Sequence, residues 1–151
     1  MTRNPLDLTP ELYIRYLLWD KAVKQAGLNY ILTCVARSED EQHALYAQGL
    51  CSLSQVNVLR EGVGLPKITA KENHRVTHTM QSRHIVNPEN PKARAFDFAL
   101  LRPGSSEVEW SLRADTNDKN GPDYLEAGKL WEEVGGVWGG RWIHSDPPHC
   151  Q

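Results

Sequence analysis

The stretch ARAFDFALL, residues 93–101, predicts a strand, because its side chains alternate in size and polarity. Successive side chains of a strand point to opposite faces, so Phe96 and Phe98 would share one face. Asp97 would lie on the other face, between two alanines. An unpaired buried carboxylate costs several kcal/mol. Asp97 therefore either forms a salt bridge or lies at the surface, or else it faces a cation.

The chain before this strand predicts a first helix over residues 10–26. Apolar side chains recur there near helical spacing, among them Leu12, Leu17 and Leu18, and Gly27 is placed to end the helix.

A strand and a second helix are expected next. Residues 30–35 are apolar enough for a buried strand. Ser38 and Glu41 have the spacing of a capping box, which would begin a helix that runs to Gly49. Residues 51–65 do not decide between a loop and a short helix.

The rest of the chain adds extended segments and one more helix. Residues 67–80 look extended, and residues 87–91 form a polar loop rich in Asn and Pro. Residues 102–121 look loop-like, residues 122–134 predict a helix, and residues 138–151 predict a hairpin or strand pair broken by glycines. The whole order favours an α+β fold, with a small, mainly antiparallel sheet and about three flanking helices.

Length and charge restrict the classes of protein. The 151 residues suffice for one domain, residues 1–151, and are few for two. A net charge of −2, without a basic block, argues against a nucleic-acid partner. No apolar run reaches the roughly 20 residues that span a bilayer, so no membrane anchor is expected. Residues 1–5 lead into an amphipathic segment and not into the apolar core of a secretory signal, so we expect the protein to be cytoplasmic when made.

The cysteines argue against a disulfide framework. Cys34, Cys51 and Cys150 are odd in number and widely spaced, which favours a reducing compartment. Because the chain has no C-x-x-C pair, any metal would rest on His and carboxylate side chains.

Two histidines and Asp97 are the candidate metal ligands. His84 comes just before the polar loop, and His149 lies in the segment DPPH, residues 146–149. Two His and one carboxylate, with a fourth position open for water, are typical of catalytic zinc. Zinc lowers the pKa of water to about 7, and a nearby carboxylate can then take its proton. Asp146, three residues before His149, is placed for that role.

The other histidines have simpler interpretations. His74 and His78 form an H-x-x-x-H pair, but the pair lacks the Glu of the zinc-peptidase motif and lies in an extended segment. His43 falls on the surface of the second predicted helix. His144 is close enough to His149 in sequence to contact the metal ligands without binding the metal itself.

Three blocks of sequence resemble one family. They are VARSEDEQHALYAQG (residues 35–49), VTHTMQSRH followed by ARAFDF (residues 76–84 and 93–98), and GGVWGG followed by DPPH (residues 135–140 and 146–149). They are similar to R-[ST]-x-x-E-Q-x-x-L-Y-x-Q-G, S-x-H…G-x-A-x-D and G-G-x-W-G…D-x-P-H. These patterns occur, in this order, in zinc D-Ala-D-Ala carboxypeptidases and L-alanyl-D-glutamate endopeptidases, particularly the single-domain endolysins of bacteriophages.

The resemblance implies a Hedgehog/D-Ala-D-Ala-peptidase-like fold and a role for each matching residue. His84, Asp97 and His149 would bind Zn²⁺. Asp146 would be the general base, and Arg37 would polarise the scissile carbonyl or stabilise its oxyanion, unless it forms a salt bridge at the start of the helix. At two further positions, substrate-facing or site-supporting roles are implied, namely Ser82 and Gln42.

The activity implied is hydrolysis of peptidoglycan stem peptides by a monomer, with the L-Ala–D-Glu bond as the expected target. D,D- or L,D-carboxypeptidase activity is one alternative, and a non-catalytic zinc-binding module of the same fold is another. The presence of both Asp146 and Arg37 argues against the binding module. By analogy, a phage-encoded membrane pore would release the enzyme to the cell wall, without a separate wall-binding domain.

Two departures from the family pattern concern the loop between the first two expected ligands. Twelve residues separate His84 from Asp97, more than the family usually has, and residues 87–92 read as an insertion. The usual glycine between these ligands is absent. The entropic cost of closing a loop grows only with the logarithm of its length. The longer loop therefore still allows Asp97 to lie beside His84. We expect the insertion either to border the active-site mouth or to be a surface excursion without a role.

Overall fold

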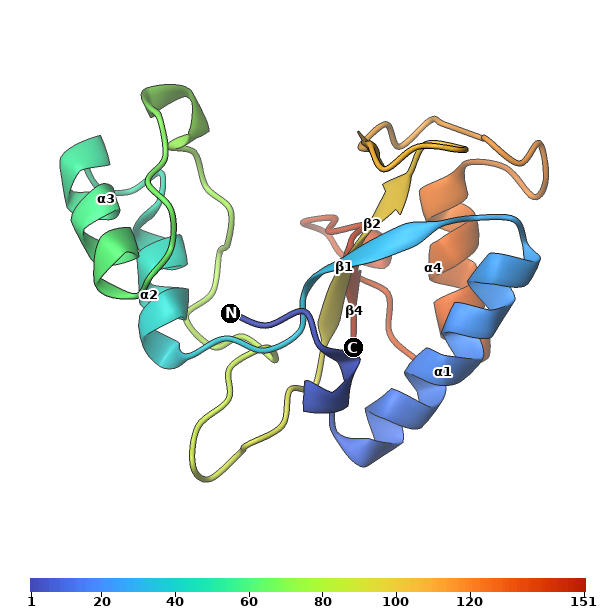
Figure 1. Ribbon diagram of the computed structural model, residues 1–151, viewed down its shortest axis with the longest axis horizontal. Helices are drawn as coiled ribbons and strands as arrows, with labels where there is room; N and C mark the ends of the chain where they lie inside the picture. The colour runs from blue at the N-terminus through green and yellow to red at the C-terminus, as the bar shows by residue number, and fades with distance from the viewer.

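A computed structural model describes residues 1–151. Its four strands form one antiparallel sheet around β2 (Phe96–Leu101), as Figure 1 shows. β1 (Tyr30–Cys34) pairs with one edge of β2. On the other edge, β4 (His149–Cys150) pairs with the beginning of β2 and β3 (Val108–Glu109) with its end. The expected α+β architecture is confirmed.

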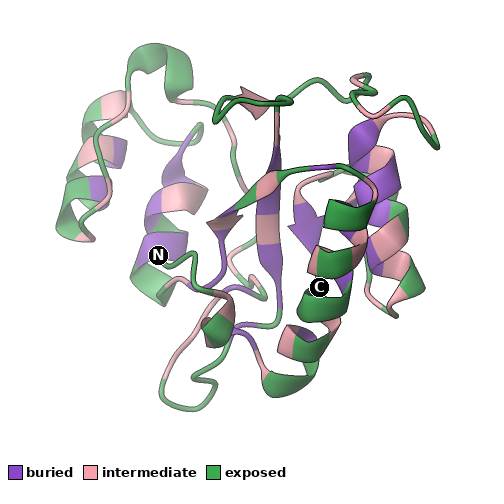
Figure 2. Cartoon of the chain, turned by 45° about the vertical axis from the view of Figure 1, so that its right-hand side comes forward, coloured by how far each residue is buried: buried purple, intermediate pink, exposed green.

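Two helices and the aromatic face of β2 form the core. α1 (Pro10–Gln25) contacts α4 (Asp123–Glu133), and both place side chains against the sheet. Trp19 lies at the centre, with its ring centroid 5.1 Å from those of both Phe96 and Phe98. Figure 2 shows the burial along β2 and α4. Aromatic pairs at these separations add to the stability gained from buried area.

The buried face of α1 differs from the expected one. Trp19 and Val23 are fully buried on it, whereas Leu17 and Leu18 are about half exposed. Large aromatic side chains of α1 fill the space above the sheet, and this turns both leucines towards solvent. The helix still ends as expected, because Gly27 adopts a positive φ of 85°.

The other two helices form a separate pair beyond β1 (Figure 1). They are α2 (Glu39–Ala47) and α3 (Leu53–Gly62), so the segment whose structure the sequence left open is partly helical. The expected capping box begins α2, with Glu41 N donating to Ser38 Oγ and Ser38 N donating to the Glu41 carboxylate.

Residues 67–80 do not form the expected extended strand. The segment contains a 3₁₀ turn, Ala70–Glu72, and is otherwise irregular. Two glutamine side chains supply hydrogen bonds that a neighbouring strand would otherwise make. Gln42 of α2 donates to Thr79 O, and Gln48, at the C-terminal end of α2, donates to Glu72 O. Backbone groups satisfied in this way need no sheet.

The C-terminal segment confirms the expected strand pair. Val137 and Gln151 exchange two backbone hydrogen bonds, and Trp138 forms an antiparallel bridge with Cys150. A short 3₁₀ helix, Gly139–Arg141, interrupts the pair. None of the helices has the length and apolar character needed to cross a bilayer.

Candidate metal centre and active site

Three side chains from distant parts of the sequence meet on the face of the sheet opposite the aromatic core. Pairing of β2 with β4 places Asp97 directly across from His149. His84 Nε2 lies 3.1 Å from Asp97 Oδ1 and 3.3 Å from His149 Nδ1, and His149 Nδ1 lies 2.9 Å from Asp97 Oδ1. Four zinc ligands at the corners of a tetrahedron are about 3.3 Å apart. The three atoms therefore have the spacing of ligands that share one metal ion.

The outer nitrogens of both imidazole rings are already engaged. His84 Nδ1 lies 2.8 Å from Val35 O, which can only accept, so Nδ1 donates its proton there. His149 Nε2 lies 3.1 Å from Gln151 Oε1, an acceptor of the same kind. In the neutral rings the inner nitrogens then carry lone pairs that face each other and the Asp97 carboxylate. Because these lone pairs and the carboxylate repel one another, either a proton or a cation has to lie among them. Histidines that bind a metal typically make outer hydrogen bonds of this kind.

The pKa shifts of Asp97 and His149 also indicate that a positive charge lies between these side chains. Burial would raise the pKa of Asp97, but its hydrogen bonds to His149 and His84 hold the pKa well below the usual range. Burial would likewise lower the pKa of His149, whereas the Asp97 carboxylate raises it overall. The carboxylate thus stays ionised and holds positive charge near it.

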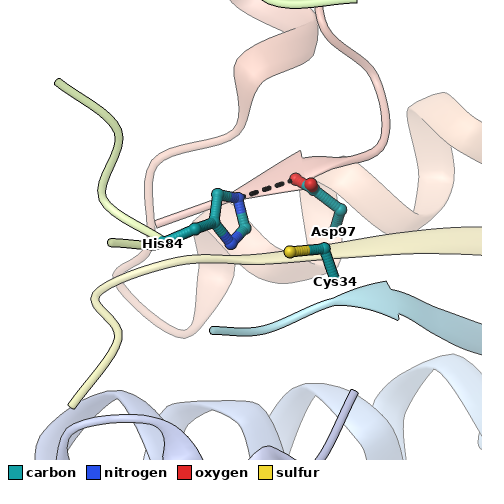
Figure 3. Close-up of side chains that lie close together, drawn as sticks. All are labelled: Cys34, His84 and Asp97. Atoms are coloured by element: carbon teal, nitrogen blue, oxygen red, sulfur yellow. Dashed lines mark hydrogen bonds and ion pairs between the residues drawn. The ribbon is translucent and has the colours of Figure 1, made fainter. Parts of the chain in front are cut away.

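Cys34 is a fourth potential donor that the sequence did not reveal. Figure 3 shows its thiol beside His84 and Asp97, and the three donor atoms lie within 4.8 Å of one another. A β-bulge in β1 causes this: Leu32 pairs with Phe98, yet Cys34, two residues on, pairs with Asp97, the neighbour of Phe98. The extra residue turns Cys34 towards Asp97. Burial raises the pKa of the thiol to about 11.

The segment that carries Asp146 is held in place by neighbouring residues. Trp138 Nε1 donates to Pro147 O over 2.8 Å, and Asp146 N donates to Gly139 O over 2.9 Å. Only glycine fits at position 139, because a Cβ atom there would lie 2.6 Å from Asp146 O and 3.0 Å from His149 Cβ. Partial burial, followed by the negative charge of Asp97, raises the pKa of Asp146. A carboxyl group with a raised pKa is suited to proton transfer.

A cavity of about 650 Å³ opens onto these side chains. Arg37 lies in its wall, with Nη2 3.5 Å from Asp97 Oδ2, and its buried Nε has no hydrogen-bond partner. Trp110 and Trp142 also line the cavity, together with the two terminal residues, Met1 and Gln151. The guanidinium group of Arg37 thus brings a fixed positive charge to the cavity wall beside the Asp97 carboxylate.

The sequence profile of a peptidase family described as D-alanyl-D-alanine carboxypeptidase matches residues 75–151, just over half of the chain. The chain belongs to this family. The matched part contains His84, Asp97, Asp146 and His149.

Among solved structures, the chain is similar to the L-Ala D-Glu endopeptidase ChiX of Serratia marcescens. The two share 17% sequence identity, with a TM-score of 0.60 over 98% of this chain and 82% of the other. At this identity the similarity shows the fold alone. No curated protein sequence matches the chain significantly.

Ser82 and Gln42, for which a substrate-facing or site-supporting role was expected, differ from each other in their position relative to the cavity. Ser82 lies in the cavity wall, and its Oγ accepts a hydrogen bond from His84 N at 3.3 Å. Gln42 is fully buried behind the wall, where its Nε2 donates to Thr79 O. Gln42 therefore supports a wall segment, whereas Ser82 faces the cavity directly.

The remaining histidines lie apart from the three converging side chains. His43 and His74 are exposed. His78 and His144, also exposed, stack on one another with ring centroids 5.5 Å apart, beside a neighbouring hollow that Asp146 borders. His144 has no contact with His84 or His149 of the kind expected for a supporting group.

Proposed function

We propose that the chain is a zinc-dependent peptidase that hydrolyses peptidoglycan stem peptides, with His84, Asp97 and His149 as the zinc ligands. The observation that carries the proposal is the convergence of two imidazole nitrogens and a carboxylate oxygen at 2.9–3.3 Å. Both outer nitrogens are engaged elsewhere, so the inner lone pairs are free for a metal ion. The donor set and the adjoining cavity fit zinc in a catalytic site.

Zinc bound there would supply Lewis acidity to the scissile carbonyl and to an attacking water. Asp146 accepts the proton of that water and passes it to the leaving amine, a role that its raised pKa and its place at the cavity support. Arg37 donates to the oxyanion that develops on the carbonyl, a role that its charge and its place in the cavity wall support. Gln42 and Ser82 hold the wall that positions the peptide.

The family description and the structural neighbour suggest different bonds. The neighbour is an L-Ala D-Glu endopeptidase, which supports cleavage of the L-Ala–D-Glu bond, and the similarity covers 98% of this chain. The family description supports D,D- or L,D-carboxypeptidase activity as the second candidate. Because the structural similarity extends over nearly the whole chain, we infer that the protein cleaves the L-Ala–D-Glu bond of the host wall as a phage endolysin.

Digestion of purified peptidoglycan, followed by mass spectrometry of the fragments, tests the proposal. New fragments with N-terminal D-Glu would support the endopeptidase, and loss of C-terminal residues alone would support a carboxypeptidase. If the zinc-loaded protein released no fragment, while binding one zinc, a non-catalytic binding module would be the better account. Lysis of permeabilised bacteria by added protein checks the endolysin role.

A further inference from the structure

A second hollow, of about 340 Å³, adjoins the catalytic cavity. The two share Gln81, Ser82 and Arg83 in their walls. Its far side is formed by Arg94 and by Asn87 and Asn90 of the inserted loop. The insertion therefore borders the site through this hollow.

Two arginines, and no acidic residue, line this second hollow. None of the protein's ion pairs includes Arg83 or Arg94, and the hydrogen bond between these two residues joins backbone atoms. Several other arginines are paired, such as Arg102 with Glu107 and Arg141 with Glu132. The hollow is thus lined by two guanidinium groups that have no ion-pair partner in the protein and can bind an anionic group.

The positions of the two arginines are fixed by the backbone. Arg94 N donates to Arg83 O over 2.8 Å, which holds the two residues side by side. Asn87 and Asn90 close the inserted loop with two backbone hydrogen bonds of 3.0 and 3.1 Å. At the base of the loop, Lys92 Nζ donates to Leu6 O over 2.7 Å. Because the backbone is already ordered, binding there would need to order only the two arginine side chains.

We propose that Arg83 and Arg94 form a binding subsite for a carboxylate of the substrate. Guanidinium groups bind carboxylates through paired hydrogen bonds, and a planar fork gives them geometric selectivity. The subsite would also distinguish a carboxylate from an uncharged amide of the same shape. This inference rests on the proposed function for the identity of the substrate.

The α-carboxylate of D-Glu is the carboxylate that fits this position. Arg83 lines both the catalytic cavity and the second hollow, so the subsite directly adjoins the place where the scissile bond would lie. In a stem peptide, D-Glu continues through its side-chain carboxyl group, which leaves its α-carboxylate free beside the L-Ala–D-Glu amide. The terminal carboxylate of the peptide is several residues farther away.

Three synthetic peptides test the subsite on the zinc-loaded full chain. They are N-acetyl-L-Ala-γ-D-Glu-L-Lys-D-Ala, the same peptide with the D-Glu α-carboxylate amidated, and the same peptide with its C-terminus amidated. For the wild type, α-amidation should lower kcat/KM about tenfold, as expected for a lost charge-assisted hydrogen bond. C-terminal amidation should have little effect. The Arg83→Gln/Arg94→Gln variant should cleave the free acid and the α-amide equally, with unchanged zinc content.

Lys92→Gln is the matched control, because it removes a nearby positive charge whose ammonium group is bonded to Leu6 O. It should keep the wild-type preference. An equal acid-to-amide ratio in the wild type and the double variant would overturn the proposal. A preference that follows the C-terminal carboxylate would overturn its assignment to D-Glu.

Should none of the peptides be cleaved, the proposed function fails, and calorimetric binding of the same peptides then decides about the subsite alone. Weaker binding of the free acid by the double variant than by the wild type would support the subsite. Equal binding would overturn it.

Discussion

Asp97 and His149 lie directly opposite one another on antiparallel strands, with His149 Nδ1 2.9 Å from Asp97 Oδ1. Cys34 lies opposite Asp97 on its other side, through the bulge in β1. Asp97 is thus flanked by an imidazole and by a thiol, and either could complete a metal site with His84.

Single substitutions distinguish these two donors. His149→Ala should abolish tight zinc binding, because it removes one of three ligands spaced at 2.9–3.3 Å. Cys34→Ser should retain about one zinc per chain, since His84, Asp97 and His149 already supply the three protein ligands of a catalytic zinc site. Elemental analysis after dialysis measures both. Zinc retained in His149→Ala and lost in Cys34→Ser would reverse the assignment.

Substitution of Asp146 should separate zinc binding from catalysis. Asp146→Asn keeps the shape of the side chain but cannot accept a proton, so kcat should fall on the order of 10²–10⁴-fold. Zinc content should stay at the wild-type value. Loss of zinc from this variant would instead make Asp146 a ligand.

Removal of the metal should make stability depend on pH. In the folded metal-free protein the pKa of His149 is raised and that of Asp97 is lowered. The protonated imidazole then stabilises the fold fully below its unfolded pKa of about 6.5, and this contribution is lost as the pH rises through the higher folded pKa. Urea unfolding of chelator-treated protein should therefore show lower stability at pH 9 than at pH 6. The zinc-loaded protein serves as the control, and an equal loss in both would contradict the prediction.

Gly139 should be essential to the geometry of the site. Gly139→Ala would place a Cβ atom 2.6 Å from Asp146 O, and we expect a loss of about 1–3 kcal/mol of stability together with weaker zinc binding. Gly62→Ala is the matched control, because a Cβ atom at that position has no neighbour within 4 Å. Similar thermal unfolding and zinc content for both variants would show that the close approach at Gly139 does not matter.

The inserted loop can be removed as a unit. Replacing residues 87–92 with one glycine should retain zinc, because none of the three proposed ligands lies in the loop, and should change substrate preference. Unchanged kinetics on the acid and amide peptides would show that the loop has no role. Loss of zinc would indicate that Glu89, a carboxylate of this loop, and not Asp97 supplies the ligand.

Much of the fold could be predicted because it depends on local patterns. The alternation around Asp97 predicted both the strand and its two faces, and the capping box predicted the start of α2. Residues 67–80 could not be predicted, because side chains of α2 satisfy that backbone in place of a neighbouring strand.

In the site, too, the features that depend on tertiary contacts could not be predicted from the sequence. The expected ligands His84, Asp97 and His149 come together in the structure, as the resemblance implied. Cys34 could not be foreseen, because its orientation depends on a one-residue bulge that leaves no signal in the sequence. The charged hollow at Arg83 and Arg94 likewise depends on a backbone hydrogen bond between residues on either side of the inserted loop.

Anomalous X-ray diffraction at the zinc edge, on crystals of the zinc-loaded protein, tests the central claim most directly. The account predicts one strong peak at about 2.0–2.1 Å from His84 Nε2, Asp97 Oδ1 and His149 Nδ1, with the fourth position open to the cavity. A peak bonded to Cys34 in place of His149, or no peak among these side chains, would contradict it.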